Sequence, residues 1–111
     1  MTGQKPWAEM VGAEPMIAEA IGRAVGALAP DPRERVRLDE HLVMDLGYDS
    51  LRTVELSFTI EELFQLDESA LGDAPSLGTV QELVDFIAKM VGSGLATMPT
   101  REDVEKVLEG L

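Results

Sequence analysis

The chain of 111 residues contains no cysteine. This absence excludes disulfide bonds, thiolate catalysis and zinc ribbons, and it is compatible with a reducing compartment. Aromatic residues make up only 5% of the chain, so its core must consist mainly of Leu, Val, Ile and Ala. No apolar run approaches the roughly 18 residues of a membrane span, and the N-terminal segment lacks the apolar core of a signal peptide. We therefore expect one small monomeric domain in the cytoplasm.

Basic residues are scarce as well. Nine Lys and Arg face 21 Asp and Glu, which gives a formal net charge of −12. Residues 39–73 hold ten acids and a single base, Arg52, so this third of the chain carries most of the net charge. A field of this sign repels nucleic acid and anionic lipid and attracts proteins with basic patches. The alternative is a solvated acidic surface that only keeps the protein in solution.

Helical spacing of apolar residues runs through most of the chain, whereas no convincing strand pattern occurs. It predicts helices over residues 15–28, 50–66, 80–91 and 101–111. Residues 67–78 are expected to form a loop with one short helical turn. The predicted fold class is therefore all-α, an antiparallel bundle of three main helices and one short helix.

Capping residues precede three of these helices. Asp49 and Thr79 are expected to cap the helices that start at residues 50 and 80. Thr100 and Asp103 form a variant capping box at the start of the last one. Ahead of Asp49, Gly47 is expected to allow a sharp turn of the backbone.

The predicted helix over residues 50–66 has two different faces when it is wound at about 100° per residue. One face, mostly apolar, is expected to pack against the other helices and carries Thr53, Leu56, Ser57, Ile60, Leu63 and Phe64. The opposite face carries Leu51, Glu55, Phe58 and Glu62, flanked by Thr59 and Glu61. Exposed apolar groups beside carboxylates are typical of a protein-binding surface, because the charges steer a basic partner and the apolar groups supply the desolvated contact.

The stretch "DLGYDSL", residues 45–51, places a serine directly at the start of this helix. Ser50 has no general base beside it in sequence and lacks the glycine spacing of a nucleophile elbow. The one histidine of the chain, His41, is expected to be a loop or partly buried residue rather than a catalytic base. Neither the spacing of a calcium-binding loop nor paired histidines occur, so no metal site is predicted. If Ser50 has chemistry, another protein must perform it.

This stretch resembles the acyl carrier protein family, the four-helix phosphopantetheine carriers of fatty acid, polyketide and nonribosomal peptide synthesis. The resemblance covers residues 15–91 and rests on "DLGYDSL", on "VEL" and "EELF" in the helix that follows, and on "TVQELVDFI" at residues 79–87. It implies a four-helix acyl-carrier bundle that is not an enzyme. An N-terminal extension over residues 1–14 and a C-terminal extension over residues 92–111 flank the carrier domain.

The resemblance also implies that Ser50 is the attachment point of 4′-phosphopantetheine, whose terminal thiol carries acyl groups as thioesters. A phosphopantetheinyl transferase would supply the catalytic apparatus, including Mg²⁺. The other implied partners are acyl-loading and acyl-processing enzymes with basic patches. The partner surface of the family carries over to Asp49, Leu51, Glu55, Phe58, Glu61 and Glu62.

Two features depart from the family pattern. Many fatty acid carriers have an acid directly after the leucine, where this chain has Arg52, and both extensions exceed the minimal carrier. These departures favour a specialised polyketide, nonribosomal peptide or lipid pathway. The alternative function is an acidic helical adaptor without a prosthetic group, in which Ser50 is only a helix cap.

The C-terminal extension combines a "GSG" segment, interpreted as a flexible linker, with a short amphipathic helix. About twelve residues are marginal as an isolated helix, so this helix needs an apolar surface to pack on. Packing on its own bundle is preferred here to docking on a partner enzyme. The stripe that would make either contact consists of Val104, Val107, Leu108 and Leu111.

Overall fold

The computed structural model of the chain describes residues 13–66 and 78–111. Over these ranges the chain forms four α-helices and no β-strand: α2 (Ala13–Leu28), α3 (Ser50–Phe64), α4 (Val80–Gly92) and α5 (Arg101–Glu109). The all-α fold class is confirmed, and each predicted helix is present with ends that differ by at most two residues. The expected short helical turn falls at residues 67–78 and, apart from Gly78, lies outside the described residues. None of the helices described here has both the length and the apolar character that a membrane span requires.

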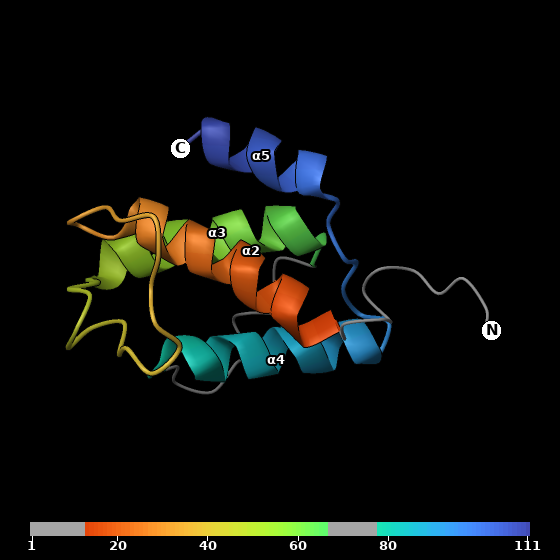
Figure 1. Cartoon of the computed structure of the whole chain (residues 1–111), viewed down its shortest axis with the longest axis horizontal. Coiled ribbons are helices and arrows are strands. Elements are labelled where there is room, and N and C mark those ends of the chain that lie inside the picture. Colours follow the sequence, from red (N-terminus) through yellow and green to blue (C-terminus); the bar gives the residue numbers. More distant parts are fainter. Residues whose placement is uncertain (1–12, 67–77) are drawn as a thin grey trace.

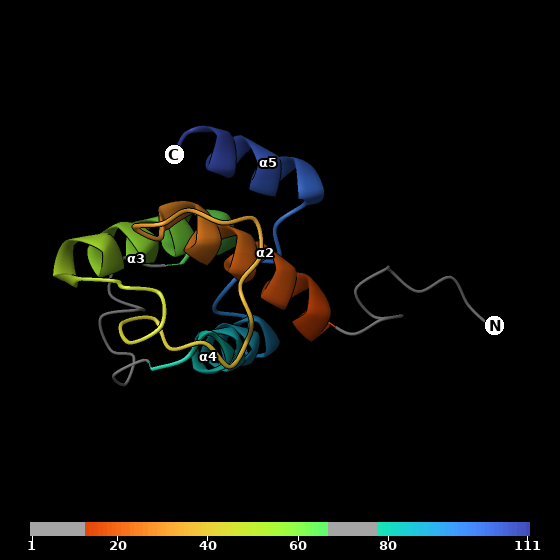
Figure 2. The same ribbon diagram turned by 60° about the vertical axis from the view of Figure 1, so that its left-hand side comes forward.

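The helix α2 is the centre of the bundle (Figure 1). It contacts α3 and α4, which lie on either side of it, and α5 contacts both α2 and α3. The turned view in Figure 2 places α5 on the side of the bundle away from α4. The C-terminal helix therefore packs on the first two described helices of its own chain.

Apolar side chains from all four helices form one core. The largest fully buried side chains are those of Phe64, Ile17, Ile21, Ile60, Leu83, Ile87, Val25, Val80 and Val84. Burying one aliphatic or aromatic side chain of this kind contributes about 1.5–3 kcal/mol. The helix α5 adds only Val104 to the buried core, with Val107 and Leu108 partly buried against it.

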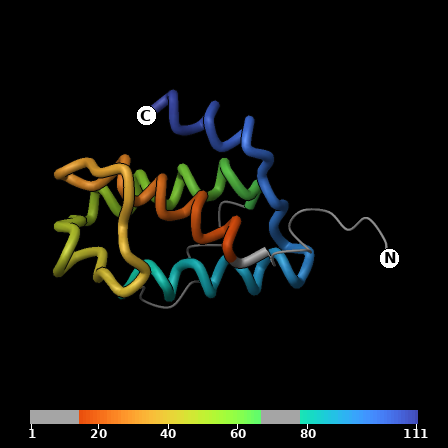
Figure 3. Tube along the Cα trace, viewed as in Figure 1, coloured from red at the N-terminus to blue at the C-terminus, as the bar shows by residue number. Residues whose placement is uncertain are grey.

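A long loop, residues 29–49, joins α2 to α3 at one end of the bundle (Figure 3). The loop returns along α2, where the N–H of Arg33 donates to the carbonyl of Gly26 at 3.0 Å. A Cβ atom at Gly26 would lie 2.3 Å from the Arg33 carbonyl oxygen, so only glycine permits this close approach. At Gly47 the backbone has φ +77°, which confirms the expected sharp turn.

The same loop is bonded to the start of α4. The N–H groups of Val80 and Gln81 donate to the carbonyls of Glu40 and Leu38 at 3.0 and 2.8 Å. The first N–H groups of a helix have no partner inside the helix, so the loop satisfies two of them. These bonds fix the path of the chain toward Ser50.

The burial of three side chains of α3 differs from the expected burial. Thr53 is exposed, so the prediction that it packs inward is wrong, and Ser57 is only half-buried. Their hydroxyls donate to the carbonyls of Asp49 and Thr53, one turn back. Thr59, predicted beside the exposed face, is buried.

The burial of Thr59 follows from the position of α5. Glu62 and Leu63 line a shallow hollow together with Val107 of α5. Thr59 precedes these two residues by three and four positions, so it shares their side of α3. One edge of the buried face of α3 therefore lies toward α5.

Candidate functional site

Ser50 is the first residue of α3 and is exposed to solvent. The preceding residue, Asp49, is the N-cap, as predicted: its backbone is extended and its Oδ1 accepts the N–H of Arg52 at 2.8 Å. The carbonyl of Asp49 accepts both the N–H and the Oγ1–H of Thr53, at 2.9 and 2.7 Å. Hydrogen bonds to Asp49 thus stabilise the first turn of α3.

The backbone at this helix start favours an anion. Among the described residues, the N–H groups of Ser50 and Leu51 have no hydrogen-bond acceptor. Unpaired N–H groups and the positive end of the helix dipole together stabilise negative charge at a helix N-terminus. A phosphate ester on the Ser50 hydroxyl would benefit from both.

His41 is half-buried in the loop before the site, as expected. Its Nδ1 accepts the N–H groups of Val43 and Met44, both at 3.2 Å. Its own backbone N–H donates to the Asp45 carboxylate at 2.7 Å. The ring Nδ1 of His41 therefore stabilises the turn that follows this residue and is not free to take a proton from Ser50.

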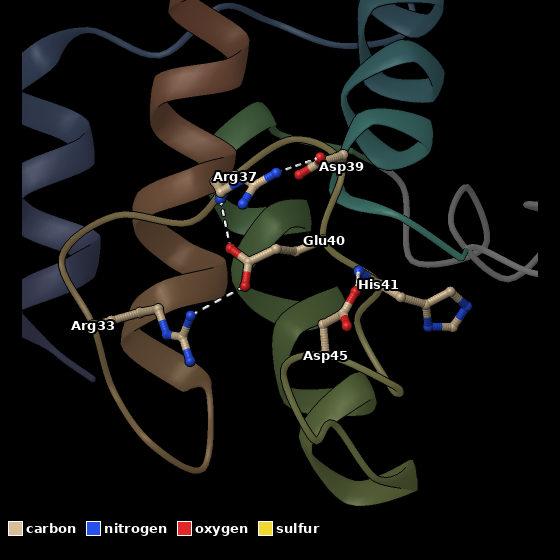
Figure 4. A network of polar contacts seen from close by, with 6 residues as sticks. All are labelled: Arg33, Arg37, Asp39, Glu40, His41 and Asp45. Atoms are coloured by element: carbon tan, nitrogen blue, oxygen red, sulfur yellow. Dashed lines mark hydrogen bonds and ion pairs between the residues drawn. The ribbon is translucent and has the colours of Figure 1, made fainter.

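Figure 4 shows the wider polar network to which His41 belongs. Glu40 accepts the N–H of Arg37 at 2.7 Å and pairs with the Arg33 guanidinium at 3.1 Å. Arg37 also pairs with Asp39 at 2.7 Å, which raises the pKa of its guanidinium. Ion pairs this exposed contribute little stability individually, so their main effect is on the geometry of the loop.

The outward face of α3 combines apolar groups and carboxylates. Leu51 and Phe58 are 69% and 63% exposed, and Glu55 and Glu62 are exposed beside them. Glu61, expected at the flank, is half-buried. These exposures agree with a protein-binding face.

Sequence reasoning missed two further exposed apolar side chains, one on this face and one in the loop before α3. Val54 is 48% exposed and lies three residues after Leu51 and four before Phe58, so helical spacing alone could have found it. Met44 is 82% exposed in the loop. No sequence pattern marked Met44, because its exposure depends on the path of an irregular segment.

Known proteins with similar sequences share the region around Ser50. Residues 16–87 match the family described as phosphopantetheine attachment site. An acyl carrier protein of Cyanidium caldarium is 41% identical over 61 residues, which cover 55% of this chain and 70% of that protein. For an acyl carrier protein of Buchnera aphidicola the identity is 37% over 73 residues, covering 66% of this chain and 90% of the relative. An acyl carrier protein of Campylobacter concisus is 38% identical over 66 residues, which cover 60% of this chain and 83% of that protein.

The chain belongs to the acyl carrier protein family. Its prosthetic group is therefore a covalently attached 4′-phosphopantetheine, and its role is to carry acyl groups rather than to catalyse their conversion. Carriers of this family interact with a phosphopantetheinyl transferase and with acyl-processing enzymes. No solved structure matches the chain significantly.

Arg52, the unusual cation of this carrier, is half-buried and turned toward α2. Its Nη1 donates to the carbonyl of Leu28 at 3.4 Å, and its Nε lies 3.9 Å from the Glu55 carboxylate. The Arg52 guanidinium therefore interacts both with the end of α2 and with a carboxylate of the outward face.

Tyr48, two residues before Ser50, is buried in this carrier and donates its hydroxyl to the carbonyl of Val25 at 2.6 Å. Burial raises the pKa of this hydroxyl well above its ordinary value, although the charge of Arg52 acts in the opposite direction. The group therefore remains a hydrogen-bond donor throughout the physiological pH range.

A cavity of about 330 Å³ lies between α2 and the segment that leads into α5. Met16, Ala20, Met98, Pro99 and Val104 supply its apolar lining. Its lining on α2 lies between Met16 and Arg23, whereas Tyr48 and Arg52 tie the region of Ser50 to the end of the same helix. The cavity therefore does not adjoin the start of α3.

Proposed function

We propose that this carrier holds its phosphopantetheine arm on Ser50. The observation that carries the proposal is the exposed hydroxyl at the start of α3, next to two N–H groups without acceptors among the described residues. These groups suit the phosphodiester that attachment creates. The arm supplies a terminal thiol on which acyl groups are held as thioesters.

The attachment step needs a partner enzyme. The Ser50 oxygen forms a bond to the phosphorus that bears pantetheine, while the bond from that phosphorus to the bridging oxygen of the coenzyme A pyrophosphate breaks. Adenosine 3′,5′-bisphosphate leaves, and the serine proton passes to a base. Because Nδ1 of His41 is engaged in its own turn, we propose that the base is supplied by the transferase or by water.

The outward face of α3 is the proposed docking surface for the transferase and for acyl-processing enzymes. It consists of Asp49, Leu51, Glu55, Phe58, Glu61 and Glu62, to which the exposed Val54 is added. The carboxylates would attract a basic partner, and the apolar groups would be desolvated on contact. Asp49 also caps α3, so its substitution would affect both docking and helix stability.

Ser50→Ala is the direct test of the attachment site. The unmodified wild-type protein, incubated with coenzyme A and a permissive transferase, should gain the mass of one phosphopantetheine, and the variant should gain none. Ser57→Ala is the matched control, because Ser57 lies two turns along the same helix and uses its hydroxyl in a bond to Thr53. Circular dichroism should give the same helix content for all three proteins. A mass gain in Ser50→Ala would place the attachment elsewhere.

The proposed pathway is a specialised polyketide, nonribosomal peptide or lipid pathway. Arg52 beside the docking surface and α5 beyond the matched region support this choice. Intact-mass analysis of the protein from its native host, with ejection of the arm to weigh its cargo, tests it. A cargo series of ordinary fatty acyl chains would contradict it.

A further inference from the structure

The C-terminal end of α2 is capped by residues that lie far away in sequence. The last four carbonyls of a helix have no partner within the helix. The last turn of α2 carries the carbonyls of residues 25–28, and it has neither a basic residue nor a directly following glycine to cap it. Partners for three of them, the carbonyls of Val25, Gly26 and Leu28, come from the loop and from α3.

Two of these partners flank Ser50. Tyr48 donates its hydroxyl to the carbonyl of Val25 at 2.6 Å, and Arg52 donates its Nη1 to the carbonyl of Leu28 at 3.4 Å. One lies two residues before Ser50 and the other two residues after it. The start of α3 is therefore tied to the end of α2 from both sides of the serine.

Such ties matter because Ser50 is the first residue of its helix. Helix ends fray, and an N-cap contact holds only part of the first turn. The docking surface includes the exposed Asp49 and Leu51 on either side of Ser50, but contacts to these side chains do not hold the first turn of α3 against the rest of the bundle. A further anchor is needed to hold the Ser50 hydroxyl in one place.

Arg52 also places positive charge at the end of α2. The C-terminal end of a helix carries partial negative charge, which is unfavourable beside a site that receives a phosphate. The guanidinium bonded to the Leu28 carbonyl offsets this charge. Its interaction with the Leu28 carbonyl therefore has an electrostatic as well as a geometric component.

We propose that Tyr48 and Arg52 are positioning residues for the modification of Ser50. The proposal rests on the proposed function, because it assumes that Ser50 is the attachment site. Both residues act by ordering the first turn of α3 against α2. They are expected to govern the rate of transfer after docking rather than the affinity for the transferase.

Tyr48→Phe removes one hydroxyl and keeps the ring, and Arg52→Met keeps most of the stem and removes the charge. Each should lower the kcat of the transferase about tenfold, since small misplacements of a reacting group have effects of this order or larger. KM should change by less than about twofold for Tyr48→Phe, because the docking surface is intact. Arg52→Met also removes the cation beside Glu55 of that surface, so its KM should fall, and its kcat carries the test. Arg52→Lys should restore most of kcat, since it returns a charged donor. Amide hydrogen exchange should accelerate at Arg52 and Thr53, whose N–H groups are bonded to Asp49, and not in α4.

Ile87→Val is the control for a loss of stability alone. Ile87 is fully buried in α4, which does not carry Ser50, so this variant should lower Tm and leave kcat unchanged. The proposal is overturned if Ile87→Val lowers kcat as much as Tyr48→Phe, if the positioning variants raise KM alone, or if their kcat equals that of the wild type. If instead wild-type protein is modified at a residue other than Ser50, the proposed attachment site fails before the anchors are tested.

Discussion

Two leucines have nearly the same exposure but different expected roles. Leu51 is 69% exposed on the outward face of α3, and Leu95 is 64% exposed after α4. Single exposed apolar residues are common on protein surfaces and need no function. What separates Leu51 is its neighbourhood, because Val54, Glu55 and Phe58 lie on the same side of the helix.

Replacing Leu51 by alanine should therefore weaken docking without loss of stability. We expect the KM of the transferase to rise about tenfold, as for a residue worth somewhat more than 1 kcal/mol at an interface. Steady-state kinetics on the unmodified protein measures this rise. Leu95→Ala is the matched control and should leave KM unchanged, and both variants should keep their unfolding free energy within about 0.5 kcal/mol. Equal effects of the two variants on KM would contradict the proposed docking surface.

The α4 helix depends on its cap. Thr79 accepts the N–H of Glu82, and the Glu82 carboxylate accepts the N–H groups of Thr79 and Gly78 at 2.8 and 3.1 Å. These bonds lower the pKa of Glu82, with the Thr79 N–H as the largest cause. Because the pKa is lower in the folded protein, the stabilisation is present above the ordinary glutamate pKa and is lost as pH falls through the folded value.

The Glu82→Gln variant should lack this pH-dependent stabilisation, because its side chain carries no charge at any pH. At pH 7 the variant should melt below the wild type, and the difference should shrink once the pH falls below about 4.3, the ordinary pKa of glutamate. Thermal melts of both proteins from pH 7 to pH 2.5 measure the difference. Gln81→Ala, in the same turn but outside the capping box, should give no such trend. A difference that stays constant with pH would show that the charge of Glu82 is not involved.

The α5 helix is held by few contacts. It is joined to α2 by the Arg23–Glu105 pair at 2.8 Å, and the N–H of Thr97, ahead of it, donates to the carbonyl of Phe64 at 2.8 Å. Val104 is the buried member of its apolar stripe, whereas Leu111 is 51% exposed. Most of the stability that α5 contributes should therefore depend on Val104.

Val104→Ala should lower the free energy of unfolding by about 1–2 kcal/mol, the cost of removing buried methyl groups and leaving a cavity. Leu111→Ala, in the same stripe, should cost less than about 0.5 kcal/mol. Chemical denaturation measures both. Truncation after Gly92 should lower stability further and still allow modification of Ser50. Unchanged stability after truncation would mean that α5 does not pack on its own bundle in solution.

At the scale of the whole molecule the dominant feature is charge. The net charge is −12, and four ion pairs join described residues: Arg23–Glu105, Arg33–Glu40, Arg37–Asp39 and Arg52–Glu55. Only Arg52 provides a cation within α3. Most carboxylates of the outward face are therefore left to repel one another, which destabilises the compact state.

Moderate salt should accordingly stabilise the fold. Raising the salt concentration from about 10 to 150 mM shortens the Debye length from roughly 30 to 8 Å. We expect Tm at pH 7 to rise by about 2–4 °C, which corresponds to roughly 0.5 kcal/mol. The rise should shrink near pH 4, where the carboxylates take up protons. A Tm that does not respond to salt at pH 7 would contradict this view of the charge distribution.

The sequence by itself determined the features that depend on near neighbours. The helices, the caps at Asp49, Thr79 and Thr100 and the turn at Gly47 were all predicted correctly, because caps and helical hydrogen bonds join residues within about four positions. The exposure of Leu51 and Phe58 also followed from the helical repeat. The motif around Ser50 identified the family before any geometry was known.

Only the tertiary structure decided which side of α3 is covered. Thr59 is buried on the side of α3 where Glu62 and Leu63 line a hollow together with Val107 of α5, some forty residues later in the chain. The ties of Tyr48 to Val25 and of Arg52 to Leu28 likewise span 23 and 24 residues. A local sequence pattern carries no record of such contacts, because they depend on how separate helices meet once each has formed.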